Sequence, residues 1–160
     1  MFGFSRDEVR VFKGLHRPWK IQDFVEELPM NWTDAYLSPR RVLEERRASC
    51  MDGALLAAAA LWINGERPLL LDLRTVQRDD DHVVALFQWR GRWGAISKTN
   101  HAVLRYRDPI YRTVRELACS YFHEYFLDDG AKTLREYSRP FSLARFGHDW
   151  MTTSKDLRWL

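Results

Sequence analysis

An alanine-rich stretch that is apolar on every side most strongly constrains how this chain folds. It occupies residues 50–63 and includes four consecutive alanines. A helix with no polar face has to be buried, so we expect this segment at the centre of the domain. Ser49 is suited to cap its N-terminus, and Asn64-Gly65 is suited to end it. Gly53 and the alanines would let a β-sheet approach the helix closely.

The segments around this stretch predict helices first, then antiparallel strands, then another helix. Helical spacing and capping residues mark 18–28 and 40–47 before the central helix. Strand signals follow at 68–73, at 82–88 and 93–97 around a glycine-containing turn, and at 102–107. Asp108-Pro109 reads as the start of a last helix, and the final thirty residues look irregular. This order predicts one α+β domain over residues 1–160.

Composition and charge exclude several classes of protein. Seven Trp, six Tyr and nine Phe can fill a core, and the net charge of +3 arises from basic residues mixed with acidic ones. A nucleic-acid-binding surface is therefore not expected. No apolar stretch is long enough to span a membrane, and the N-terminus is charged too early for a signal peptide. Two cysteines make no disulfide framework, so we expect a cytoplasmic protein with free thiols.

Cys50 and His82 are the two residues that a thiol nucleophile requires. A helix N-terminus stabilises a thiolate, and its unpaired backbone N–H groups suit an oxyanion. Asp52 opposes this effect with a nearby negative charge, so the activation would have to come mostly from His82. Each residue also has an ordinary structural explanation. Cys50 would be a small buried side chain, and His82 a polar residue leading into a strand.

The hairpin arithmetic indicates which residue could orient His82. If the turn is centred on Arg90-Gly91, paired positions sum to about 181, which places Ser97 and Asn100 near the histidine. Either could hold the second imidazole nitrogen, as the third member of a catalytic triad does. Asp108 and the aspartates at 79–81 remain alternatives.

At this point the chain resembles the transglutaminase-like superfamily, a papain-like thiol fold. The resemblance covers about residues 38–97 and depends on five motifs in order: Ala48-Ser49-Cys50, the Leu61 to Gly65 helix end, the strand Pro68 to Leu73, Asp81-His82-Val83-Val84, and Gly91 to Ser97. Three further stretches are similar to a small group of bacterial members: 20–24, 96–101 and 120–125. The family usually has aspartate where this chain has Ser97, so an intact Cys-His-Asp triad is not expected.

The resemblance implies a cysteine-dependent acyl-transfer enzyme. Cys50 would attack an amide or ester carbonyl of a protein or peptide substrate, and a thioester would pass to water or to an amine. The alternative is a protein-binding module on the same fold with a weak or inactive site. An aromatic side chain upstream of Cys50, Trp32 or Tyr36, could help form an oxyanion site or could belong to the core.

No cofactor or metal is expected. Cys119 and His123 share a helical face, but a second pair of ligands at zinc spacing is missing. The sequence does not indicate the oligomeric state.

Overall fold

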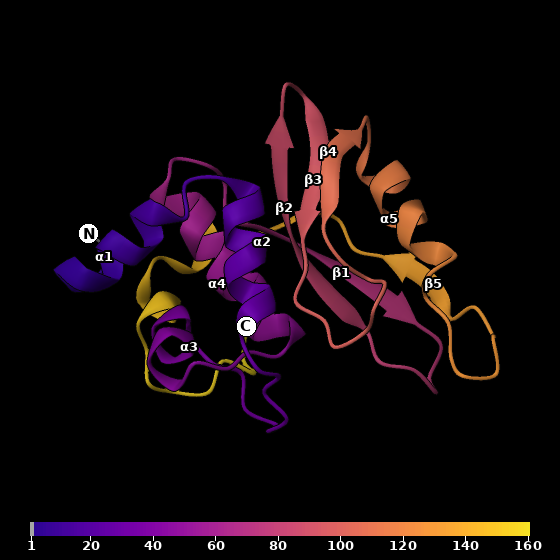
Figure 1. Ribbon diagram of the computed structural model, residues 1–160, viewed down its shortest axis with the longest axis horizontal. Coiled ribbons are helices and arrows are strands. Elements are labelled where there is room, and N and C mark those ends of the chain that lie inside the picture. Colours follow the sequence, from indigo (N-terminus) through magenta and orange to yellow (C-terminus); the bar gives the residue numbers. More distant parts are fainter. Residues whose placement is uncertain (1) are drawn as a thin grey trace.

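The computed structural model describes residues 2–160 and has an α+β fold, as predicted. In this part of the chain, helices α1 to α4 precede a run of strands, and α5 lies between the fourth and fifth strands (Figure 1). The helices are α1 (Arg6–Gly14), α2 (Pro18–Glu27), α3 (Pro39–Glu45), α4 (Cys50–Ile63) and α5 (Val114–Phe122). The strands are β1 (Leu69–Thr75), β2 (His82–Trp89), β3 (Arg92–Ile96), β4 (Arg107–Tyr111), β5 (Leu134–Tyr137) and β6 (Phe141–Ser142).

The strands form one antiparallel sheet in the order β4-β3-β2-β1-β5, and β6 also pairs with β1. The β2–β3 hairpin has the predicted register, with Ala85 opposite Ile96 and Trp89 opposite Arg92. Arg90 and Gly91 both have positive φ, 49° and 74°, which is the conformation that a two-residue hairpin turn requires. The turn therefore fixes which side chains of the two strands face each other.

Helices cover both faces of the sheet (Figure 1). Strand residues such as Leu70, Ala85 and Ile96 pack with α4 in one hydrophobic cluster. Their neighbours along the strands, including Leu71 and Leu86, belong to a second cluster with residues of α5. Both faces of the central strands are therefore buried, because alternate side chains serve different layers.

Helix α4 lies in the core, which confirms the prediction from its apolar sequence. All of its side chains from Asp52 to Leu61 are buried. Ser49 caps it by accepting a hydrogen bond from the backbone N–H of Asp52, whose side chain accepts in return from Ser49 N–H. A Cβ atom at Gly53 would lie 2.3 Å from the Cβ of Lys98. Glycine is therefore needed where the chain after β3 crosses the first turn of α4.

Three sequence predictions about the rest of the chain are wrong. Asp108 and Pro109 lie in β4, not at a helix start, and Thr113 caps α5 instead. Proline is tolerated there because β4 is at the edge of the sheet. The strand predicted for 102–107 is absent apart from its last residue, and the irregular C-terminal region contributes β5 and β6.

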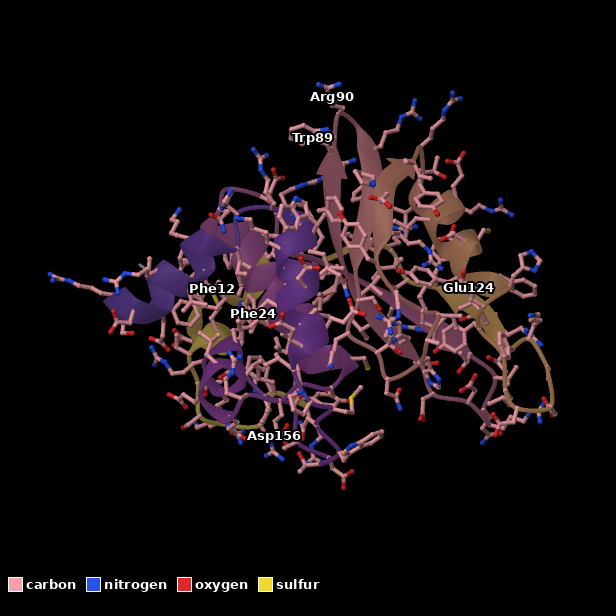
Figure 2. All side chains as sticks on the ribbon, in the orientation of Figure 1. Phe12, Phe24, Trp89, Arg90, Glu124 and Asp156 are labelled. Carbon is pink, nitrogen blue, oxygen red and sulfur yellow. The ribbon has the colours of Figure 1, made fainter. Side chains whose placement is uncertain are left out.

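The C-terminal segment crosses from the sheet to the helical layer. After β5 and β6 it forms two short 3-10 turns, Leu143–Phe146 and Asp149–Met151, and buries Trp150 completely. It ends beside the loop that precedes α3, where Leu157 N–H donates to the Tyr36 carbonyl at 3.1 Å. Asp156, labelled in Figure 2, accepts from the Tyr36 N–H, also at 3.1 Å. None of the described helices has the length and apolar character to cross a membrane.

Candidate functional site

Cys50 is the first residue of α4, as its capping sequence predicted, and its side chain is partly buried. Burial raises the pKa of the thiol, and the negative charge of Asp52 adds to this rise. The backbone N–H groups of Val83, Met51 and Cys50 favour the thiolate but do not overcome the burial. The N–H groups at the helix N-terminus do lower this pKa, as expected, but loss of water around the sulfur has the larger effect.

His82 begins β2 and is held by a chain of two hydrogen bonds. Its Nε2 lies 2.7 Å from the hydroxyl oxygen of Ser97, and that hydroxyl donates to the Leu104 carbonyl at 2.5 Å. A carbonyl oxygen can only accept, so the single hydroxyl hydrogen of Ser97 points to Leu104. The Ser97 oxygen must then accept from Nε2–H. This arrangement fixes the neutral tautomer of His82 with its lone pair on Nδ1.

Nδ1 of His82 is the ring nitrogen that remains available as a base. Nδ1 has no hydrogen-bond partner within residues 2–160. In the same range, every side-chain nitrogen or oxygen that is fully buried does have a hydrogen-bond partner. Nδ1 is therefore not completely enclosed, although His82 as a whole is only 5% exposed. Within the same residues no hydrogen bond joins His82 to the Cys50 sulfur. The N–H of the His82–Val83 peptide faces the sulfur. The side chain of His82, however, lies on the same face of β2 as Val84 and Leu86, which is the face opposite α4.

The imidazole is neutral at physiological pH. Burial, with a smaller contribution from the nearby His101, lowers its pKa to about 4, and the Leu104 carbonyl opposes this shift. Together with the raised pKa of Cys50, this describes a resting pair of uncharged thiol and uncharged imidazole. The site is thus distinct from one that holds a thiolate–imidazolium ion pair at rest.

Ser97 is the only one of the suggested orienting residues that the described structure brings to His82. Asn100 is exposed in the turn after β3, and Asp108 is exposed in β4. The upstream carboxylates bond elsewhere: that of Asp79 to the Thr133 hydroxyl and that of Asp81 to the N–H and hydroxyl of Thr75. Within the described residues, no carboxylate is hydrogen-bonded to the imidazole.

Gln22 positions Ser97, a role that the sequence reasoning missed. Its side chain is 6% exposed and forms two hydrogen bonds of 2.9 Å to the backbone of Ser97, one to the carbonyl and one from the N–H. The next residue, Lys98, is also buried and donates from Nζ to the Leu28 carbonyl. Residues 97–98 are therefore hydrogen-bonded to α2 and to its C-terminal end. The available signal was a polar residue on the apolar stripe of that helix, between Ile21 and Val25.

Asp52 fastens the loop before α4 to the first turn of that helix. Its carboxylate is completely buried and accepts from Leu37 N–H at 2.7 Å, Ser49 N–H at 2.8 Å and Asn31 Nδ2 at 2.9 Å. The same loop places Tyr36 close to Cys50. Burial raises the pKa of this tyrosine, and charge on Cys50 would raise it further. Trp32, by contrast, is 77% exposed.

The pair of residues suggested for a metal lies on α5 and at its end. Cys119 is exposed, and His123 caps the helix C-terminus. Across residues 2–160 no group of three or more His, Cys, Asp or Glu side chains is arranged to hold a metal ion.

Alkylation of Cys50 should be slow at neutral pH. Iodoacetamide reacts with the thiolate, and the raised pKa keeps that form scarce. In a Cys119→Ser background we expect the rate at Cys50 to rise about tenfold per pH unit from pH 7 to pH 9 without a plateau. Peptide mass spectrometry after timed quenching measures this rate. A plateau below pH 8 would show that the thiol is already ionised there and would contradict the raised pKa.

The comparisons with known proteins do not identify a family for this chain. A scan against models of protein families finds no match, and neither does a search of curated proteins.

Proposed function

We propose that this protein is a cysteine-dependent acyl-transfer enzyme with a papain-like, transglutaminase-like arrangement. Cys50 is the nucleophile, His82 the general base and Ser97 the residue that orients the base. The observation that carries the proposal is the hydrogen-bond chain from His82 Nε2 through Ser97 to the Leu104 carbonyl. It leaves Nδ1 unprotonated, on a residue whose following peptide N–H faces the Cys50 sulfur.

The reaction begins from the neutral pair. The Cys50 sulfur attacks the carbonyl carbon of an amide or ester in a protein or peptide, and its proton passes to Nδ1 of His82. Nδ1–H then protonates the leaving amine or alcohol as the tetrahedral intermediate breaks down to a thioester. Water or an amine attacks the thioester and regenerates the thiol. Backbone N–H groups at the start of α4 are suited to stabilise the oxyanion.

A neutral orienting residue is compatible with this chemistry here. When a neutral side chain replaces the triad carboxylate, it can donate to the imidazole and enforce the unproductive tautomer. Ser97 cannot do so while its hydrogen is bonded to Leu104. The productive tautomer is retained, although the imidazolium formed during the reaction lacks a carboxylate to stabilise it. We therefore expect turnover slower than that of an enzyme with a carboxylate in this position.

The second candidate is a protein-binding module with an inactive site. The raised pKa of Cys50 and the lowered pKa of His82 favour it, because both oppose formation of an ion pair. A test with an activated ester separates the two proposals, since formation of an acyl-enzyme needs a nucleophile and a base but no particular protein partner.

An enzyme of the proposed kind should become acetylated on Cys50 by p-nitrophenyl acetate. The expected result is a burst of p-nitrophenol of up to one equivalent and an acetyl group on the peptide that contains Cys50. His82→Ala should slow the burst by about 100- to 10,000-fold, because the general base is lost. Cys119→Ser is the matched control and should react like the unmodified protein. If Cys50→Ala shows the same burst, or if His82→Ala leaves the rate unchanged, the binding module is the better description.

A further inference from the structure

A cavity lies at the opposite end of α4 from Cys50. It has a volume of about 610 Å³ and is bounded by the start of α2, the end of α4 and the sheet strands β2 and β4. Leu61 and Asn64 line it from α4. At 1.5 Å per residue, the eleven residues from Cys50 to Leu61 separate it from the thiol by about 17 Å. The cavity is therefore distinct from the candidate thiol site.

Two stacked aromatic rings form the wall of this cavity on the sheet side. Phe87 and Tyr106 have ring centroids 5.8 Å apart and planes within 23° of parallel. Gly94 lies opposite Phe87 in the hairpin, and a Cβ atom there would be 2.4 Å from the Phe87 ring and 2.7 Å from the Arg107 carbonyl. The absence of a side chain at Gly94 thus lets Phe87 lie flat across β3. This packing leaves the Phe87 ring little room to change position.

Two half-exposed tryptophans, each with a basic side chain over its ring, also line the cavity. Trp19 and Trp89 are each 54% exposed. Lys20 lies 5.6 Å from the Trp19 ring centre, and the guanidinium of Arg90 lies 5.9 Å from that of Trp89. Figure 2 shows Trp89 and Arg90 at the tip of the β2–β3 hairpin, away from the rest of the fold. The cavity thus combines two indoles available for stacking with cations beside them.

The other polar side chains that line the cavity include both positively and negatively charged groups. Arg17 contributes a guanidinium, Asp108 and Glu66 contribute carboxylates, and Gln88 contributes an amide. An indole stacks on a planar ring, a guanidinium or ammonium group binds an anion, and a carboxylate accepts from hydroxyl or amino groups. A ligand that uses all three has a planar heterocycle, a polyhydroxylated linker and an anionic end.

We propose that this cavity binds a purine mononucleotide. The base stacks on Trp19 or Trp89, and the phosphate binds to Arg17, the guanidinium that lines the cavity. Asp108 and Glu66 accept hydrogen bonds from the ribose hydroxyls or the exocyclic amine. This site is independent of the acyl-transfer chemistry proposed for Cys50.

Isothermal titration calorimetry with AMP tests the site in the 160-residue chain. AMP should bind with one-to-one stoichiometry and more tightly than adenosine, which lacks the phosphate, or ribose 5-phosphate, which lacks the base. Trp19→Ala and Trp89→Ala should weaken AMP binding, by about 5- to 100-fold for a tryptophan that stacks on the base. Arg17→Ala should weaken binding of AMP more than binding of adenosine. All three side chains are exposed, so the variants should fold.

Two matched variants serve as controls. Trp159 is 60% exposed and packs against Phe146 away from the cavity, so Trp159→Ala should bind AMP normally. Cys50→Ala should also bind normally, since the thiol lies at the other end of α4. The proposal is overturned if AMP produces no binding heat at millimolar concentration. It is also overturned if Trp19→Ala and Trp89→Ala both bind AMP with the affinity of the unsubstituted protein. Much tighter binding of a single-stranded oligonucleotide than of AMP would overturn it in favour of a nucleic-acid surface.

Discussion

Asp52→Ala is expected to lower the free energy of unfolding by about 3–5 kcal/mol. The substitution removes a fully buried carboxylate and leaves the backbone N–H groups of Leu37 and Ser49 and the side-chain amide of Asn31 without their acceptor. An unsatisfied buried donor costs about 1–3 kcal/mol, and water entering the vacated space recovers part of this. Urea unfolding followed by circular dichroism measures the change.

A surface carboxylate provides the matched control for Asp52. Asp7 lies in the first turn of α1, its side chain is 87% exposed, and it pairs with Arg10 on the same helix. Asp7→Ala should change the free energy of unfolding by less than about 0.5 kcal/mol. For a chain of this size, each kcal/mol corresponds to about 2–4 °C in Tm. A loss below 1 kcal/mol in Asp52→Ala would mean that the three donors find other acceptors.

Acidification should destabilise the protein through His82. The unfolded histidine has a pKa of about 6.5, whereas burial lowers the folded value to about 4. Between these values the unfolded chain binds a proton that the folded chain does not, so a falling pH favours unfolding. The contribution is fully present above pH 6.5, is lost progressively as pH falls to about 4, and amounts to about 3 kcal/mol.

The variant His82→Gln isolates this effect from other titrating groups. Glutamine can still donate to the Ser97 oxygen but does not titrate. We expect the free energy of unfolding of the original protein to fall by about 3 kcal/mol more than that of His82→Gln between pH 7 and pH 4. Denaturant titrations at half-unit pH intervals supply both curves. Parallel curves would show that His82 is not held in its neutral form by the fold.

Local sequence signals predicted the elements that position the candidate site. The all-apolar composition of α4, the cap at Ser49 and the hairpin register around Arg90-Gly91 all describe contacts between residues close in the chain. The register also brought Ser97 near His82, and the structure adds the hydrogen bond between them. These predictions needed only periodicity, capping and turn geometry, which short segments encode by themselves.

What the sequence did not reveal depends on contacts between distant residues. The bonds from Gln22 to Ser97 join residues 75 positions apart, and nothing local indicates the acceptor of a buried glutamine. Asp108-Pro109 forms an edge strand, not a helix start, because this segment pairs with β3 and because Thr113 caps α5 instead. Helix α1 was detectable, since Ser5 and Glu8 form a reciprocal capping box.

Because the C-terminal segment crosses to the helical layer, the surroundings of Cys50 are completed late in synthesis. During synthesis α4 and the hairpin emerge before residues 134–157, yet those residues complete the edge of β1 and hold the Tyr36 loop next to Cys50. A ribosome-bound chain that ends at Gly130 has all the residues of the thiol site but not the strand and turns that brace its surroundings. The surroundings of Cys50 are therefore complete only after residues 134–157 have been synthesised, and shorter nascent chains should expose its thiol more to alkylation or oxidation.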